Sequence, residues 1–131
     1  MIIGAHFLLY SKDAEADRAF LRDILGLRPV DVGHGWLIFG MSPAEAAVHP
    51  LEGDFSHEHA GQEMLGAVLY LMCDDLEAQI ASFRAKNVQF TPVQTAPWGI
   101  TTSMELPSGG KLGLYQPRHE TALHLQLPST E

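Results

Sequence analysis

A short phrase that occurs twice limits what this chain can fold into. It consists of an apolar strand, an acidic cap and an amphipathic helix, and its copies begin at residues 5–13 and 67–75. A short chain with an internal copy is typical of two half-domains that pack around one shared pocket. The copies differ in their chemistry, because His6 of the first corresponds to Val68 of the second.

Length and charge restrict the class of protein. The 131 residues, 46% of them hydrophobic, are enough for one domain with a core of its own and too few for two. A net charge of −8 argues against nucleic acids and anionic membrane surfaces as partners. Cys73 is the single cysteine, so no intrachain disulfide can form, and we expect a cytoplasmic protein in which this thiol is buried and structural.

The first half reads as one helix among four strands. We expect a helix from Asp13 to Leu25, capped by Asp13 and ended by Gly26, because apolar side chains recur along one of its sides. The apolar alternation around it predicts strands over residues 2–10, 27–32, 36–39 and 45–49, with a hairpin turn at Gly33-His34-Gly35.

The second half repeats this order. A helix capped by Asp74 or Asp75 is expected to end at Asn87, and strands are predicted over residues 66–73, 88–90, 99–106 and 111–116, with a tight turn at residues 107–110. The organisation is therefore a single domain over 1–131: repeat one 2–50, a linker with a surface loop 51–63, repeat two 64–117 and a tail 118–131. The alternating leucines of the tail could add an edge strand or dock onto a partner subunit.

These two βαβββ units, together with Pro97-Trp98-Gly99, the turn Pro107-Ser108-Gly109-Gly110 and the closing phrase at residues 111–117, resemble the vicinal oxygen chelate superfamily. That superfamily includes glyoxalases, extradiol dioxygenases, fosfomycin-modifying enzymes and bleomycin-sequestering proteins. The resemblance implies an α+β fold in which two βαβββ repeats form a cup-shaped mixed sheet with the helices outside. It also implies a homodimer.

In the metal-using members of that superfamily, four ligand positions line the cup, one on the first and one on the last strand of each half. His6 matches the first position, whereas the resemblance aligns the others with Ala46, Val68 and Gly113, which carry no ligand atom. We therefore predict no metal and no other cofactor. A weaker alternative is a divalent metal held by His6 and His49, which requires a bulge that turns His49 inward.

Other polar candidates have simpler explanations. Glu45 and Glu105 are the carboxylates closest to the expected ligand positions, and both are interpreted as solvated charges at strand edges. His57 and His59 alternate as metal ligands on a strand can, but the surrounding glycines and charges favour an exposed loop.

Apolar and aromatic side chains are the stronger functional signal. They recur on the strands expected to surround the cup, where they would form an adaptable pocket for a small apolar or aromatic molecule. With His6 as the polar anchor, the predicted ligand-binding residues are His6, Tyr10, Trp36, Tyr70, Met72, Trp98, Met104 and Tyr115.

Two functions follow, and the sequence leaves open whether the chain is an enzyme. The first is a small-molecule-binding protein with a degenerate metal site. The alternative is a divalent-metal-dependent lyase or extradiol-type dioxygenase that uses His6 and ligands not yet placed. An accessory domain without a ligand is a third possibility. No catalytic residue is assigned, because no nucleophile has a base beside it.

Overall fold

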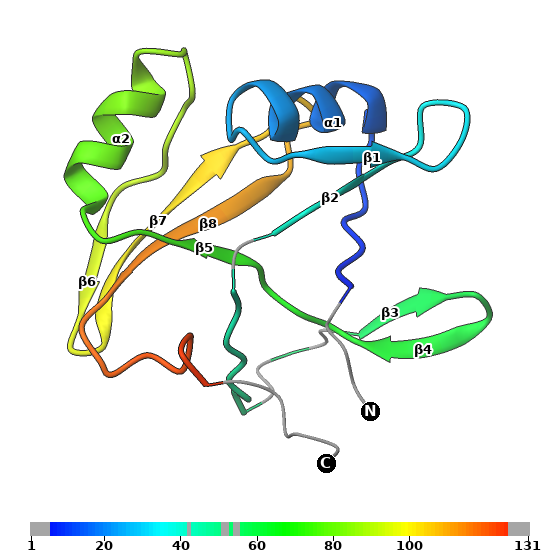
Figure 1. The fold of residues 1–131 in the computed structure, drawn as a ribbon. Coiled ribbons are helices and arrows are strands. Elements are labelled where there is room, and N and C mark those ends of the chain that lie inside the picture. The colour runs from blue at the N-terminus through cyan, green and yellow to red at the C-terminus, as the bar shows by residue number, and fades with distance from the viewer. Residues whose placement is uncertain (1–5, 42, 51–52, 54–55, 126–131) are drawn as a thin grey trace.

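The computed structural model of the chain describes residues 6–41, 43–50, 53 and 56–125. The fold is α+β, as predicted, and Figure 1 shows two helices beside a sheet from the second half of the chain. In chain order the elements are α1 (Ala14–Asp23), β1 (Pro29–Asp31), β2 (Leu37–Phe39), β3 (Ser56–His59), β4 (Gln62–Leu65), β5 (Tyr70–Met72), α2 (Leu76–Arg84), β6 (Gln94–Ala96), β7 (Gly99–Glu105) and β8 (Lys111–Pro117).

Both helices begin at the predicted aspartates. The Asp13 carboxylate accepts a hydrogen bond from the Ala16 amide at 3.2 Å, and Asp75 accepts one from the Ala78 amide at 3.1 Å, so each satisfies an otherwise unpaired donor of the first turn. The predicted stops are also confirmed, since Gly26 and Asn87 follow α1 and α2 with positive φ angles of 73° and 66°.

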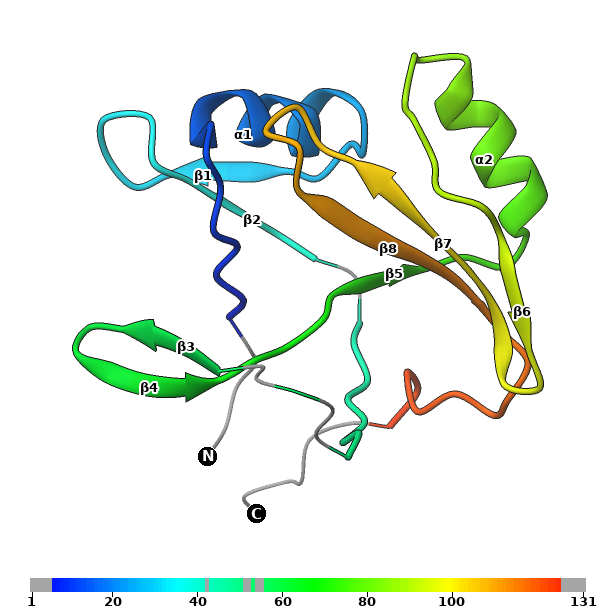
Figure 2. The same cartoon turned by 180° about the vertical axis from the view of Figure 1, so that it is seen from behind.

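The main sheet has four strands in the order β5-β8-β7-β6. β7 and β8 pair antiparallel across the predicted turn, in which the Leu106 amide donates to the Gly110 carbonyl at 2.8 Å, and β5 pairs with β8 in parallel. One face of this sheet packs against both helices, and the buried apolar cluster there comprises Phe20, Leu76, Ile80, Val88, Met104, Leu106, Leu112 and Leu114. Figure 2 shows the helices on the same side of the sheet from behind.

A buried carboxylate ties the first helix to this sheet. Asp17 of α1 is 7% exposed and accepts hydrogen bonds from the Ser108 amide at 3.0 Å, the Ser108 hydroxyl at 2.7 Å and the Ser11 hydroxyl at 2.6 Å. Three donors compensate for the loss of water around the charge. The turn between β7 and β8 is thereby held against the first half of the chain.

Two predicted strands of the first half are not formed. Of the strand predicted over 2–10, residues 2–5 lie outside the described residues, and residues 6–10 are extended chain outside any sheet. The strand predicted over 45–49 is likewise absent. The physical reason is the same for both, because neither segment has a backbone hydrogen bond to another described residue, and a strand requires such a partner.

The segment predicted as a linker contains a hairpin instead of a loop. β3 and β4 pair antiparallel from Ser56↔Leu65 to His59↔Gln62, and Figure 1 shows this hairpin projecting away from the main sheet. Ala60 and Gly61 connect the strands with φ angles of 52° and 74°, which match the twist of a two-residue hairpin. The sequence pattern does not indicate this hairpin, because the segment is so polar.

In the second half, β6 was not predicted, and the strand predicted over 88–90 is reduced to a single bridge between Phe90 and Met104. The strand predicted over 66–73 is regular only at Tyr70–Met72, because β8 pairs with it only there. No helix in the described part of the chain has the length and apolar character needed to cross a membrane.

Candidate functional site

The candidate site lies on the sheet face opposite the helices. Side chains alternate along a strand, so the burial of Leu112 and Leu114 of β8 in the core places Gly113 and Tyr115 on the other face. β5 aligns Tyr70 with Gly113 and Met72 with Tyr115, and directly paired residues share a face. Tyr70, Met72 and Tyr115 therefore come together away from the core.

Three aromatic rings on this face form what we call the aromatic wall, Tyr70, Trp98 and Tyr115. Tyr115 is its centre, with ring centroids 5.9 Å from Tyr70 and 5.6 Å from Trp98, and both pairs meet edge to face at 63°. The Tyr115 hydroxyl donates to the Trp98 carbonyl at 3.1 Å, which fixes the turn between β6 and β7 against β8. Tyr70 and Trp98 remain 42% and 51% exposed, so the wall is accessible.

Two glycines make room for these rings. A Cβ atom on Gly113 would lie 2.5 Å from Cε1 of Tyr70 and closer still to its Cδ1. A Cβ on Gly99 would lie 2.6 Å from the Gln116 carbonyl oxygen and closer still to the Tyr115 ring. Any other residue at these positions would displace a ring, so the wall depends on the absence of both side chains.

A carboxylate lies at the edge of the wall. Glu45 accepts a hydrogen bond from the Ala122 amide at 2.9 Å, and its other oxygen lies 3.8 Å from Nε2 of His119. The His119 ring in turn lies 5.8 Å from the Tyr115 ring at an angle of 34°. Desolvation, and next to it the charge of Glu45, raises the pKa of the Tyr115 hydroxyl, so this phenol stays protonated and acts as a donor.

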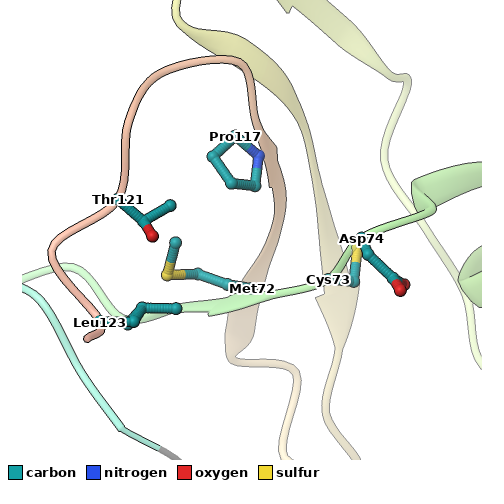
Figure 3. A pocket seen from close by; sticks show the side chains of 6 residues that line it. All are labelled: Met72, Cys73, Asp74, Pro117, Thr121 and Leu123. Atoms are coloured by element: carbon teal, nitrogen blue, oxygen red, sulfur yellow. The ribbon is translucent and has the colours of Figure 1, made fainter.

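An apolar pocket of about 270 Å³ adjoins the wall (Figure 3). Met72, the neighbour of Tyr115 across β5 and β8, is one of its lining residues, and the complete lining is Met72, Cys73, Asp74, Pro117, Thr121 and Leu123. Desolvation and then the charge of Asp74 raise the pKa of the Cys73 thiol, so it stays neutral and is a poor nucleophile. The thiol is only partly buried and lines the pocket, whereas the sequence predicted a buried one.

The residues at three of the superfamily's four metal positions do not fit a metal ion, and His6 alone remains. Ala46 and Val68 offer no donor, and the space beside Gly113 is filled by the Tyr70 ring. His49 directs its Nδ1 to the Pro50 carbonyl at 2.7 Å. Within the described ranges, no three His, Cys, Asp or Glu side chains gather in a way that could hold a metal.

The structure assembles only part of the predicted ligand-binding set. Tyr70, Met72, Trp98 and Tyr115 lie together at the wall and pocket, whereas Met104 is completely buried in the core beneath the helices. Because β7 pairs Met104 with the core residue Leu112, it faces away from the site and must be removed from the set.

The first-half candidates lie elsewhere. Tyr10 contacts the hairpin, with its hydroxyl hydrogen-bonded to Nδ1 of His59. Trp36 is 54% exposed, and the Arg18 guanidinium lies over its ring, 4.9 Å from the ring centre. His6 is exposed on the extended segment that precedes α1. Glu45 and His119 were not predicted as site residues. Neither belongs to a motif, and their proximity to Tyr115 arises from the chain path after β2 and β8.

Comparison with known proteins agrees with this fold. The family described as Glyoxalase/Bleomycin resistance protein/Dioxygenase superfamily matches residues 4–112. Among proteins of curated function, none matches the sequence.

Solved structures share the fold at low sequence identity. The antibiotic binding protein TnmS3 from a Streptomyces species is 21% identical, with a TM-score of 0.59, and the match covers 89% of this chain and 98% of that one. The fosfomycin resistance protein FosX from Listeria monocytogenes is 14% identical, with a TM-score of 0.58, and the match covers 95% of this chain and 100% of that one. Lactoylglutathione lyase from Agrobacterium tumefaciens is 20% identical, with a TM-score of 0.55, and the match covers 82% of this chain and 88% of that one.

Proposed function

Since the chain belongs to the glyoxalase/bleomycin resistance protein/dioxygenase superfamily, we propose that it binds a small apolar or aromatic molecule against the aromatic wall and the adjoining pocket. The observation that carries this proposal is the wall itself, three accessible rings held in place by two glycines beside an apolar hollow. Exposed aromatic rings next to an apolar pocket suit a planar ligand, which stacks on them and displaces water.

Binding rather than turnover is the function that these side chains support. Of the superfamily's four metal positions only that of His6 carries a ligand atom, and the pocket thiol is kept neutral. A fold relative, TnmS3, is an antibiotic binding protein, and we propose that this chain likewise captures a small molecule, with the antibiotic as one ligand class to test. The single cysteine is compatible with action in the cytoplasm.

We further propose that the chain acts as a homodimer. The extended segment before α1 supports this, because Phe7, Leu8 and Leu9 are 45%, 50% and 45% exposed. Exposed apolar side chains that lie together are typical of protein interfaces, and a second copy would supply the strand partner that this segment lacks.

Tryptophan fluorescence tests the binding proposal directly. The chain has two tryptophans, so Trp36→Phe leaves Trp98 as the only one, and its emission then reports on the wall. We expect planar aromatic compounds to quench it in a saturable manner and to raise the melting temperature of the protein. Trp98→Phe is the matched control, in which the remaining Trp36 should not respond. A panel that leaves Trp98 and the melting temperature unchanged would refute the proposal.

A further inference from the structure

The chain places a ring of its own against the proposed site. His119 lies over Tyr115 at 5.8 Å and within 3.8 Å of the Glu45 carboxylate, so one nitrogen heterocycle contacts an aromatic face and a negative charge together. This ring is planar and presents a nitrogen toward the carboxylate. The contacts of His119 therefore show which chemistry this edge of the wall satisfies.

Two carboxylates, Glu45 and Asp74, lie at the site, against one arginine beside it, Arg118. The Glu45 side chain is 21% exposed and therefore accessible from the wall, and Asp74 lies at the pocket. None of the pocket-lining residues is basic. Arg118 approaches the wall through its backbone, whose amide donates to the Trp98 carbonyl at 2.9 Å, while its side chain is exposed. The net charge of −8 adds a long-range field that attracts cations.

We propose that the ligand of this site is a planar aromatic cation. This inference rests on the proposed binding function and adds the charge of the ligand to it. The ring of the ligand would stack on the aromatic wall, whose electron-rich faces attract positive charge. Its charge would lie near the Glu45 carboxylate, beside His119 or in its place. An apolar wall alone would not discriminate between ligands of different charge, so charge selectivity is what separates this inference from the broader one.

Three acridines of one shape and different charge provide the test. In the Trp36→Phe protein at mildly alkaline pH, quenching of Trp98 is titrated with the cation 10-methylacridinium, neutral acridine and the anion acridine-9-carboxylate. We expect the cation to bind about five- to tenfold more tightly than acridine, from one exposed cation–π contact and one partly exposed ion pair. The anion should bind most weakly.

Two variants locate the effect. Glu45→Gln is expected to weaken 10-methylacridinium about threefold and to leave acridine unchanged. Glu77→Gln removes the same charge from α2, on the opposite side of the sheet, and should change neither affinity. Charge-independent binding of the three compounds, or equal effects of both variants, would overturn the inference while leaving the proposed function intact. If no acridine quenched Trp98, both would fail.

Discussion

Gly113→Ala is the substitution that examines the site most directly. The new Cβ would lie 2.5 Å from Cε1 of Tyr70, whereas carbon atoms in contact are about 3.5–4.0 Å apart, so the ring must retreat by about 1 Å or more. Overpacking of this kind costs about 1–3 kcal/mol. Tyr70 is 42% exposed and can move toward solvent, but it then loses its edge-to-face contact with Tyr115, which places the cost near the middle of the range at about 2 kcal/mol. Replacing glycine in a strand returns about 0.5–1 kcal/mol of backbone entropy. The net expectation is a loss of about 1 kcal/mol.

A double-mutant cycle identifies the cause of that loss. In a Tyr70→Ala background the obstructing ring is gone, so Gly113→Ala should stabilise the protein by about 0.5–1 kcal/mol. The same substitution thus changes sign between the two backgrounds. The free energy of unfolding is measured by urea denaturation followed by circular dichroism, with all variants at one protein concentration.

The control is Gly110→Ala, where the nearest atom to the new Cβ is Oγ of Ser108 at an ordinary 3.5 Å. This variant should behave alike in both backgrounds, because Gly110 lies at the turn before β8 and not beside Tyr70. If the effects of Gly113→Ala and Tyr70→Ala on the free energy of unfolding were additive, a side chain at position 113 would not occupy the space of the Tyr70 ring. Our account of the aromatic wall would then be wrong.

Other predictions concern the remainder of the chain. Asp17→Ala should lower the free energy of unfolding by about 2 kcal/mol, because it removes the acceptor of the part-buried Ser108 amide and of two serine hydroxyls. Asp23→Ala on the exposed side of α1 should change it little, and urea denaturation compares the two variants. Sedimentation equilibrium should give twice the chain mass of 14.4 kDa, and Leu8→Asp should give the monomer mass; a monomeric parent protein contradicts the dimer. Iodoacetamide should alkylate Cys73 only at a higher pH than a free cysteine, since burial raises its pKa; modification at neutral pH at the free-thiol rate would contradict this.

The parts of the fold that local chemistry determines were predictable. Asp13 and Asp75 cap their helices wherever those helices pack, and Gly26 and Asn87 end them because these residues adopt positive φ at low cost. The turn before β8 was predicted for a similar reason. The α+β class followed from these local features and the internal repeat.

Pairing between distant segments was not predictable in the same way. The segment at residues 6–10 has the alternation of a strand, yet no described residue pairs with its backbone. Alternation reports that a segment can form a strand, and a partner determines whether it does. The polar hairpin of β3 and β4 shows the converse, since its pairing is set by a two-residue turn.

The candidate site was predictable where residues lie on paired strands. Tyr70, Met72 and Tyr115 were predicted as ligand-binding residues because they are aromatic or methionine side chains on expected strands, and the pairing of β5 with β8 brings them onto one face. Met104 was misassigned because one face of β7 cannot be distinguished from the other when both carry apolar or small side chains. Glu45 reaches Tyr115 from an irregular segment, and no periodicity describes that path.

Gly113 explains why a metal centre and the aromatic wall exclude each other in this chain. The superfamily resemblance places an acidic ligand at this position, but any side chain there would enter the volume of the Tyr70 ring. Restoring a carboxylate alone would therefore displace Tyr70 and still leave Ala46 and Val68 without ligand atoms. Several positions would have to change together before a metal could bind with fixed geometry. Our proposal of recognition by aromatic contact at this end of the sheet therefore depends on the packing of one glycine against one ring.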